Sequence, residues 1–252
     1  MKTFSKTELN QYREYGFIIV KKLFSNNEIN NISNWIDELA DRAPRIGKEM
    51  YYYEDDLRKP HKKLLNRLEK FCDYNEQAND LAYSKRIIDR LHQLYGEEPI
   101  LFKDKINFKY PGSSGFKPHQ DIQAGWLDYA SSFISVLITI DKSTHENGCL
   151  EIVSGQHKRG WIGRMWHPLE GDELKGLKFE EYETFLGDTV FFDCFTPHKS
   201  EGNLSDKKRR NIYLTYNKLS DGNKLEKYFS DKRKNYPPDN ERDSNKTYVF
   251  KV

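Results

Sequence analysis

The sequence has few cysteines and no long apolar run. Its three cysteines, Cys72, Cys149 and Cys194, form no closely spaced pair in a chain of 252 residues. Such a sparse, odd set excludes a disulfide-stapled fold and indicates a reducing compartment. The longest largely apolar run, residues 133–140, is far shorter than the roughly 20 residues of a membrane-spanning helix. Because the first residues also lack an apolar signal segment, we expect a cytoplasmic protein with no membrane partner.

The sequence also has no excess of charge of either sign. Its 41 basic residues nearly balance 39 acidic ones, so the formal net charge is +2. This balance gives no electrostatic footprint for nucleic acid, and we expect no nucleic-acid partner. The densest basic run, residues 207–210, has the composition of a short solvated turn.

Aromatic residues are abundant, with 16 tyrosines and 15 phenylalanines. Together with the aliphatic residues they can build a real core, so the chain is not of the disordered class. The length fits one domain over residues 1–252. Within it we expect a mostly helical part over 1–98, a β-rich core over 99–220 and a polar, loosely wrapped or partly disordered tail over 221–252.

Helix signals dominate the first hundred residues. Ser5 and Ser25 each stand three residues before a glutamate, which is the capping-box pattern. They predict helices over about 5–15 and 25–39, separated by a strand at 17–20. Residues 44–60 are expected to form a charged, tyrosine-rich loop, and residues 61–95 two further helices on the spacing of their apolar residues.

Strand signals replace them after Gly96. Residues 100–110 alternate, which predicts two faces of a strand, with Phe102, Ile106 and Phe108 on one face and Lys103, Lys105, Asn107 and Lys109 on the other. Further short strands are expected at 132–140, 148–153, 183–185, 189–192 and 211–217. This pattern predicts an α+β protein with an antiparallel sandwich or jelly roll as its core.

Two histidines and a carboxylate form the candidate reactive site. One residue separates His119 from Asp121, so on a strand or strand end both side chains can reach one metal. His198 follows a predicted turn and an apolar strand that a jelly roll can bring alongside. Two imidazoles and a carboxylate suit Fe(II) with open coordination positions. The same residue types also serve catalytic zinc, and a chain with seven histidines can contain the short spacing by chance.

Arg209 lies eleven positions after His198, at the start of a predicted strand. On that strand it shares a face with Asn211, Tyr213 and Thr215. A guanidinium on a polar inner face is a good fork for a carboxylate. The alternative is that Arg209, like its neighbours, belongs to the solvated basic turn.

Longer segments around these residues resemble the phytanoyl-CoA dioxygenase (PhyH) family of Fe(II)/2-oxoglutarate-dependent oxygenases. They are EYGFIIVKKLFSNNEI, KPHQD, HENGCLEIVSGQHKRG, GDTVFFDCFTPHKSEGN and RRNIYLTYN, in the family's order over about residues 8–220. The resemblance implies a double-stranded β-helix, cupin-like core with flanking N-terminal helices. It also implies that Fe(II) is held by His119, Asp121 and His198, that Arg209 pairs with the distal carboxylate of 2-oxoglutarate, and that O2 is a co-substrate.

The segment DKINFKYPG is similar to the corresponding part of ectoine hydroxylase, a member of this family. This similarity implies that Lys109 contacts 2-oxoglutarate. Asn107, on the same face, and Ser200, two residues after the last histidine, are further candidates for binding the co-substrate.

Candidate substrate-binding residues surround the histidine–aspartate pair. Gln123, Trp126 and Tyr129 follow it closely and can wall a pocket. Lys103 can meet an anionic substrate group, and Arg164 can close the pocket with a cation. Residues 122–129 depart from the long signature of ectoine hydroxylase, so ectoine is not assigned as the substrate.

The expected function is hydroxylation of an unactivated C–H bond of a small polar metabolite, with release of succinate and CO2, by a monomer or homodimer. Related halogenases have a small residue where this chain has Asp121, so an aspartate favours oxygen insertion. The sequence leaves open desaturation, oxidative cyclisation, and hydroxylation of an acyl-CoA or a protein side chain. A non-enzymatic or zinc-binding cupin-like module is the alternative of another class.

Overall fold

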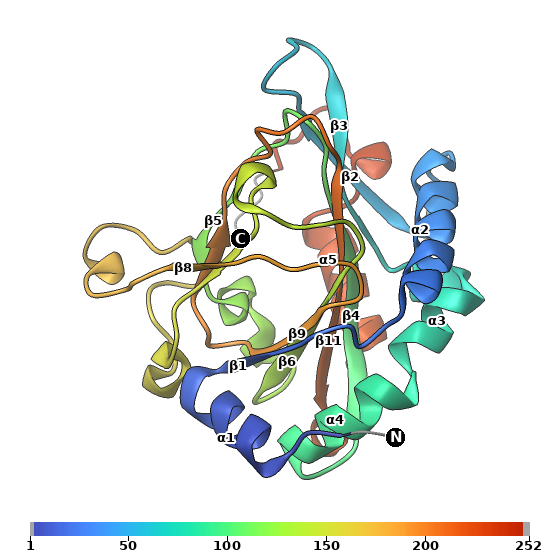
Figure 1. Ribbon diagram of the computed structural model, residues 1–252. Helices are drawn as coiled ribbons and strands as arrows, with labels where there is room; N and C mark the ends of the chain where they lie inside the picture. The colour runs from blue at the N-terminus through green and yellow to red at the C-terminus, as the bar shows by residue number, and fades with distance from the viewer. Residues whose placement is uncertain (1–2, 249–252) are drawn as a thin grey trace.

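The computed structural model describes residues 3–248 and contains two antiparallel sheets (Figure 1). An apolar cluster joins them, with Leu137, Val190 and Phe192 from the larger sheet and Leu150 and Ile152 from the smaller. The larger sheet has the order β1 (Phe17–Val20), β9 (Thr189–Asp193), β6 (Phe133–Thr139), β11 (Arg209–Lys218), β4 (Pro99–Lys109), β3 (Lys63–Glu69) and β2 (Met50–Asp55). The smaller has the order β5 (Phe116–His119), β10 (His198–Ser200), β7 (Leu150–Ile152) and β8 (Glu180–Tyr182).

Helices cover the outer face of the larger sheet. They are α1 (Lys6–Tyr15), α2 (Asn26–Asp41), α3 (Glu76–Ala82) and α4 (Lys85–Tyr95), and α2, α3 and α4 lie along one side of the sheet in Figure 1. The two predicted capping boxes are confirmed, because Ser5 and Ser25 each exchange hydrogen bonds with the glutamate three residues later. Within residues 3–248, no helix is both long and apolar enough to cross a membrane.

Strand β4 separates an apolar outer face from a polar inner face. Ile106 and Phe108 pack with the helices, whereas Lys103, Asn107 and Lys109 are buried on the opposite side. The prediction for Phe102 was wrong, because this ring belongs to a separate inner cluster. A bulge explains the difference: β11 pairs Thr215 with Lys103 and Tyr216 with Leu101, leaving Phe102 as the extra residue.

Two segments form a hairpin that the sequence pattern did not predict. The expected loop over residues 44–60 contains β2, and the first of the two helices expected over 61–95 is β3. Leu64, Leu65 and Leu68 have helical spacing, but β3 is buried along nearly its whole length, Arg67 and Glu69 included. Because charged residues occupy a buried face, the alternation of polar and apolar residues that marks a half-exposed strand is lost. Residues 1–98 are therefore less helical than expected.

The described part of the predicted tail, residues 221–248, is also more ordered than expected, and the last four residues of that tail lie outside the described residues. A helix, α5 (Leu225–Asn235), lies beside β4, and Tyr228 and Phe229 on it are buried in the cluster that contains Phe102. The strand expected at residues 183–185 lies slightly earlier, as β8. The predicted strands at 132–140, 148–153, 189–192 and 211–217 correspond to β6, β7, β9 and β11.

The placement of β3 in the core predicts different effects for two substitutions in that strand. Leu68 is fully buried, so Leu68→Ala should lower the free energy of unfolding by about 2–5 kcal/mol. Lys63→Ala removes only an exposed side chain and a surface ion pair, and should cost less than about 1 kcal/mol. Urea denaturation followed by circular dichroism measures both values. Similar small losses in the two variants would contradict the buried position of Leu68.

Candidate metal centre and adjoining pocket

The predicted histidines and aspartate meet between β5 and β10. His119 ends β5, Asp121 begins the following 3-10 helix η2 (Asp121–Ala124), and His198 begins β10. Strands β5 and β10 pair so that the two histidines lie opposite each other, with ring centroids 4.3 Å apart. One ligand atom from each residue lies within 4.8 Å of the others, a grouping that could hold a metal ion.

Each histidine is oriented by the backbone. The Nδ1 atoms of His119 and His198 lie 2.7 Å and 3.0 Å from the carbonyl oxygens of Lys117 and Thr196. A carbonyl only accepts, so each Nδ1 donates and each Nε2 keeps a lone pair for a metal. Burial, reinforced by the neighbouring His198, lowers the pKa of His119 to about 3, so this imidazole is neutral. His119 therefore has the protonation state that metal ligation requires, and both rings turn Nε2 away from the backbone.

Asp121 is held with one oxygen occupied and one available. Its Oδ2 accepts a hydrogen bond of 2.8 Å from the hydroxyl of Ser135 on β6, and its Oδ1 lies 3.9 Å from Nε2 of His198. Burial acts to raise the pKa of Asp121, but the two histidines and Lys105 outweigh it and keep the carboxyl below its ordinary value. The donor set therefore contains two imidazoles and one carboxylate whose ionised form is favoured, which suits a divalent metal.

Two cations are buried side by side near the metal centre. Arg209 begins β11 directly opposite Lys109 of β4, and both side chains are fully buried. Lys109 donates to Ser200 Oγ at 2.8 Å and to the backbone oxygens of Gly148 and Glu201. Burial, together with the charge of Arg209, lowers the pKa of Lys109 to about 6. A negative charge placed between the two side chains would offset their repulsion and favour the charged form of Lys109.

Arg209 keeps part of its hydrogen-bonding capacity unused. Its contact with Ser143 Oγ is long, at 3.4 Å, and its Nε has no hydrogen-bond partner in the structure. The Oδ1 atom of Asn107, on the same inner face, is also buried without a partner. Buried polar atoms in proteins are rarely left unsatisfied, so this face is built to receive a polar ligand.

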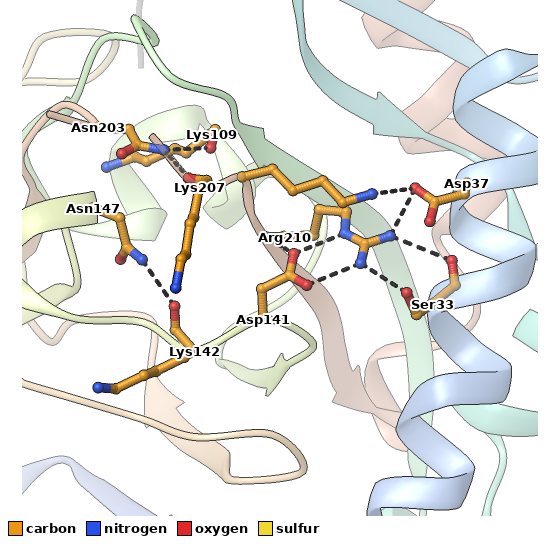
Figure 2. Close-up of polar contacts among 10 residues, drawn as sticks. Ser33, Asp37, Lys109, Asp141, Lys142, Asn147, Asn203, Lys207 and Arg210 are labelled. Carbon is orange, nitrogen blue, oxygen red and sulfur yellow. Dashed lines mark hydrogen bonds and ion pairs between the residues drawn. The ribbon is translucent and has the colours of Figure 1, made fainter. Parts of the chain in front are cut away.

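Arg210 points the opposite way from Arg209. Its guanidinium bonds the Asp141 carboxylate and reaches Ser33 and Asp37 on α2, as Figure 2 shows. Arg210 therefore fastens β11 to the outer helix. Arg209 is buried as well, so the alternative that it belongs to a solvated turn is wrong. In the same view Asn203 donates to the Lys109 backbone oxygen and ties the loop after β10 to β4 (Figure 2).

A pocket of about 380 Å³ opens beside the histidines and aspartate. Of the residues predicted for substrate, Lys103 and Trp126 line it, together with His119 and Asp121. Lys105 also lines the pocket, on the polar face of β4 where it was predicted. Other lining residues were not predicted, and several of them lie on the unpredicted hairpin or on the C-terminal part of the chain. They include Tyr52, Glu54, Arg67, Phe116 and Tyr236.

Three predicted substrate residues do not line this pocket. Gln123 is fully buried and its amide donates to the backbone oxygens of Arg164 and His167, so it holds the loop that follows η5 (Gln156–Arg159). The hydroxyl of Tyr129 donates to Asp231 on α5. The side chain of Arg164 is 60% exposed and pairs with Glu170. The contacts of all three are explained by packing, and their roles in substrate binding remain predictions.

A fold of two antiparallel sheets that brings two histidines and a carboxylate together at strand ends is typical of a class, the cupin-like metal-dependent oxygenases. Comparison with known proteins places the chain within this class. The family model for phytanoyl-CoA dioxygenase (PhyH) matches residues 12–211, so the chain belongs to that family.

Relatives and solved structures agree with this assignment. The chain is 35% identical to 2-aminoethylphosphonate dioxygenase of the uncultured bacterium HF130_AEPn_1, over 98% of this chain and 95% of the relative. It is 31% identical to methylphosphonate hydroxylase of Gimesia maris, over 93% and 88%. The crystal structure of EctD from S. alaskensis with 2-oxoglutarate and 5-hydroxyectoine shares its fold, with a TM-score of 0.75, 20% identity and coverage of 86% and 77%. The protein is an Fe(II)- and 2-oxoglutarate-dependent dioxygenase.

The geometry predicts that loss of one imidazole abolishes stable metal binding. His119→Ala should retain no stoichiometric Fe(II) after anaerobic desalting, because two remaining ligands cannot form the facial site. His145→Ala is the matched control, since this exposed histidine pairs with Glu181 far along the chain from the site. Iron content is measured by a chelator assay. Full iron retention by His119→Ala would place the metal elsewhere.

Proposed function

We propose that this dioxygenase hydroxylates a small anionic metabolite, a phosphonate in particular, with iron held by His119, Asp121 and His198. Iron loaded with 2-oxoglutarate supplies the oxidising chemistry, in which O2 is consumed and succinate and CO2 are released. The chain itself positions the two substrates and excludes water from them. The protein is proposed to work in the cytoplasm as a monomer or homodimer.

Arg209 and Lys109 are proposed to bind the distal carboxylate of 2-oxoglutarate. The two cations face each other across β4 and β11, and Arg209 has an unsatisfied Nε. A carboxylate between them would supply the missing acceptor and relieve the repulsion between two buried like charges. Ser200 already bonds Lys109 and orients its ammonium, while Asn107 offers a further polar group on the same face.

The main support for an anionic substrate comes from the position and surroundings of Lys105. Its side chain lines the pocket together with His119 and Asp121. Its ammonium lies 4.7 Å and 5.8 Å from the ring centres of Tyr213 and Phe116, and the described residues give it no hydrogen bond or ion pair. Burial, reinforced by Lys103, lowers the pKa of Lys105 to about 7. A half-buried amine without a counter-ion beside the reactive centre is best stabilised by an anion.

Two further features support a small phosphonate. Arg67 and Lys103 line the same pocket, so three cationic side chains converge on it. The pocket volume lies at the low end for ligand sites, which favours a small metabolite over a long acyl chain. Two of the relatives are named for phosphonates, 2-aminoethylphosphonate and methylphosphonate.

The opposite directions of Arg209 and Arg210 give a matched pair of variants. Arg209→Met should raise the KM for 2-oxoglutarate by at least about tenfold, because hydrogen bonds to charged groups contribute about 1.5–3 kcal/mol. Arg210→Met should leave that KM nearly unchanged and lower stability by about 1.5–3 kcal/mol, because it breaks the link to Asp141 and α2. Succinate formation and thermal unfolding measure the two effects. An unchanged 2-oxoglutarate KM in Arg209→Met would move the anchor to another residue.

A substrate panel tests the proposed function directly. With Fe(II), ascorbate and 2-oxoglutarate, succinate release should be stimulated by 2-aminoethylphosphonate or another short alkylphosphonate, and a hydroxylated product should be detected by mass spectrometry. Ectoine, an acyl-CoA thioester and the uncharged alcohol of matching length serve as comparisons. Stimulation by the acyl-CoA alone would refute the small-anion proposal.

Lys105 supplies the residue-level test of the same proposal. Lys105→Met keeps most of the side-chain volume but removes the charge, and should raise the KM for the phosphonate by about tenfold or more. Lys105→Arg should retain much of the affinity because it retains the positive charge. The KM for 2-oxoglutarate should stay nearly constant in both. Equal KM values for the phosphonate in Lys105→Met and the wild type would remove Lys105 from the substrate site.

A further inference from the structure

The C-terminal segment, defined here as residues 225–242, reaches the pocket although it lies outside the residues matched by the family model. Tyr236 lines the pocket and its ring stacks on Tyr52 of β2, with centroids 5.5 Å apart. The Tyr52 hydroxyl donates to the Tyr236 backbone oxygen at 3.0 Å. The segment therefore forms one wall of the pocket against the β2–β3 hairpin.

Several contacts fasten this segment over the hairpin and the inner face. Asp239 accepts a hydrogen bond of 2.7 Å from the Tyr53 backbone, and Glu241 accepts one of 2.8 Å from Gly47. Tyr228 packs against Phe102 at the centre of the inner aromatic cluster. The wall is thus a packed part of the fold, and its composition can determine what the pocket accepts.

Beneath the wall, a single buried carboxylate is surrounded by cations. Glu69 is fully buried on the inner face of β3, directly opposite Lys105 in the strand register. Its nearest cation comes from the C-terminal segment, where Lys232 donates to Oε2. The pocket-lining cations are farther away, with Arg67 at 3.5 Å and Lys103 at 3.8 Å from Oε1.

This arrangement decides how much positive charge faces the pocket. If Lys232 were absent, Glu69 would be left with Lys103 and Arg67 as its counter-ions, since a buried carboxylate must be paired. Those two side chains already lie within ion-pair distance of Glu69, and without Lys232 they would be held more tightly towards it and away from a ligand in the pocket. With Lys232 bonded to Glu69, Lys103 stays between the rings of Trp126 and Tyr228, 5.5 Å from each centre.

We propose that the C-terminal segment completes the anion-binding part of the substrate site: Tyr236 walls it, and Lys232 occupies Glu69 so that Lys103 and Arg67 face the substrate anion. This inference rests on the proposed function, because it assumes an anionic substrate in this pocket. Lys232 is a positioning residue, since it lines neither the pocket nor the metal centre. Tyr236 is a specificity-determining residue that touches the substrate space directly.

The test measures anion binding without turnover. Enzyme loaded with Fe(II) and 2-oxoglutarate is titrated anaerobically with 2-aminoethylphosphonate in a calorimeter. Lys232→Met should weaken binding by about tenfold, because the lost charge changes the pairing of two cations that face the ligand. Lys232→Arg should restore most of the affinity. Lys234→Met, an exposed position on the same helix, is the matched control and should bind as the wild type does.

A second substitution shows whether Lys232 positions the cations or only stabilises the fold. Adding Glu69→Gln to Lys232→Met removes the carboxylate that competes for Lys103, so the double variant should bind the anion more tightly than Lys232→Met alone. If Lys232 only anchors α5, the second substitution should weaken binding further or leave it unchanged. Circular dichroism and the melting temperature of each variant show whether the fold is kept.

Tyr236 gives an independent measurement. Tyr236→Ala should weaken binding of 2-aminoethylphosphonate and improve acceptance of a phosphonate with a longer chain, whereas Tyr236→Phe should resemble the wild type. Wild-type affinity for the anion in Lys232→Met, with no change of chain-length preference in Tyr236→Ala, would overturn this inference and leave the proposed function intact. If the loaded wild type binds no phosphonate, the proposed function itself fails, and this inference fails with it.

Discussion

The crowding of buried positive charge on one face of the larger sheet is the constraint on which the rest of this structure depends. Arg67, Lys103, Lys105, Lys109 and Arg209 all lie on β3, β4 or β11, and each lines or adjoins the interior between the sheets. Within the described chain, Glu69 is the fully buried acid on that face, and it balances only part of this charge. Burial of positive charge is costly unless a negative charge lies close by, and this cost is the physical basis for the proposal that two anions bind there, one beside Arg209 and one beside Lys105.

The candidate metal centre adjoins the pocket, because His119 and Asp121 line it. Pairing of β5 with β10 brings the histidines together, and Ser135 from the larger sheet fixes the carboxylate between them. The Ser135 hydroxyl also lies 3.0 Å from Thr215, which is paired with Lys103 on the strand that carries the cations. A short polar chain therefore joins the metal ligand to the substrate side of the sheet. The larger sheet thus carries the cations proposed to bind the co-substrate and the substrate, whereas the smaller sheet carries the two histidines.

Much of this site could be predicted from sequence because its signals are local. The spacing of the histidine and the aspartate, and the alternation along β11, are read directly from neighbouring residues. The alternation places Arg209 on the inner face, and it also explains why Arg210 faces α2. The pocket walls could not be found in this way. Burial of charge on β3 removed the strand pattern, so Arg67 was placed on a helix. The bulge in β4 turned Phe102 inward, and nothing in the alternation marks it. Tyr236 lines the pocket only because of the tertiary fold, and no local sequence pattern indicates this position.

The orientation of the two histidines has a consequence for how such a protein can diversify. Each Nδ1 is held by the carbonyl oxygen two residues earlier in the chain, Lys117 for His119 and Thr196 for His198. A backbone oxygen is supplied by any amino acid, so the geometry of these two ligands does not depend on which side chains surround them. Mutations can therefore change the hairpin and the C-terminal wall while the orientation of the two imidazole rings stays the same. An oxygenase built in this way can acquire new substrates without rebuilding its reactive centre.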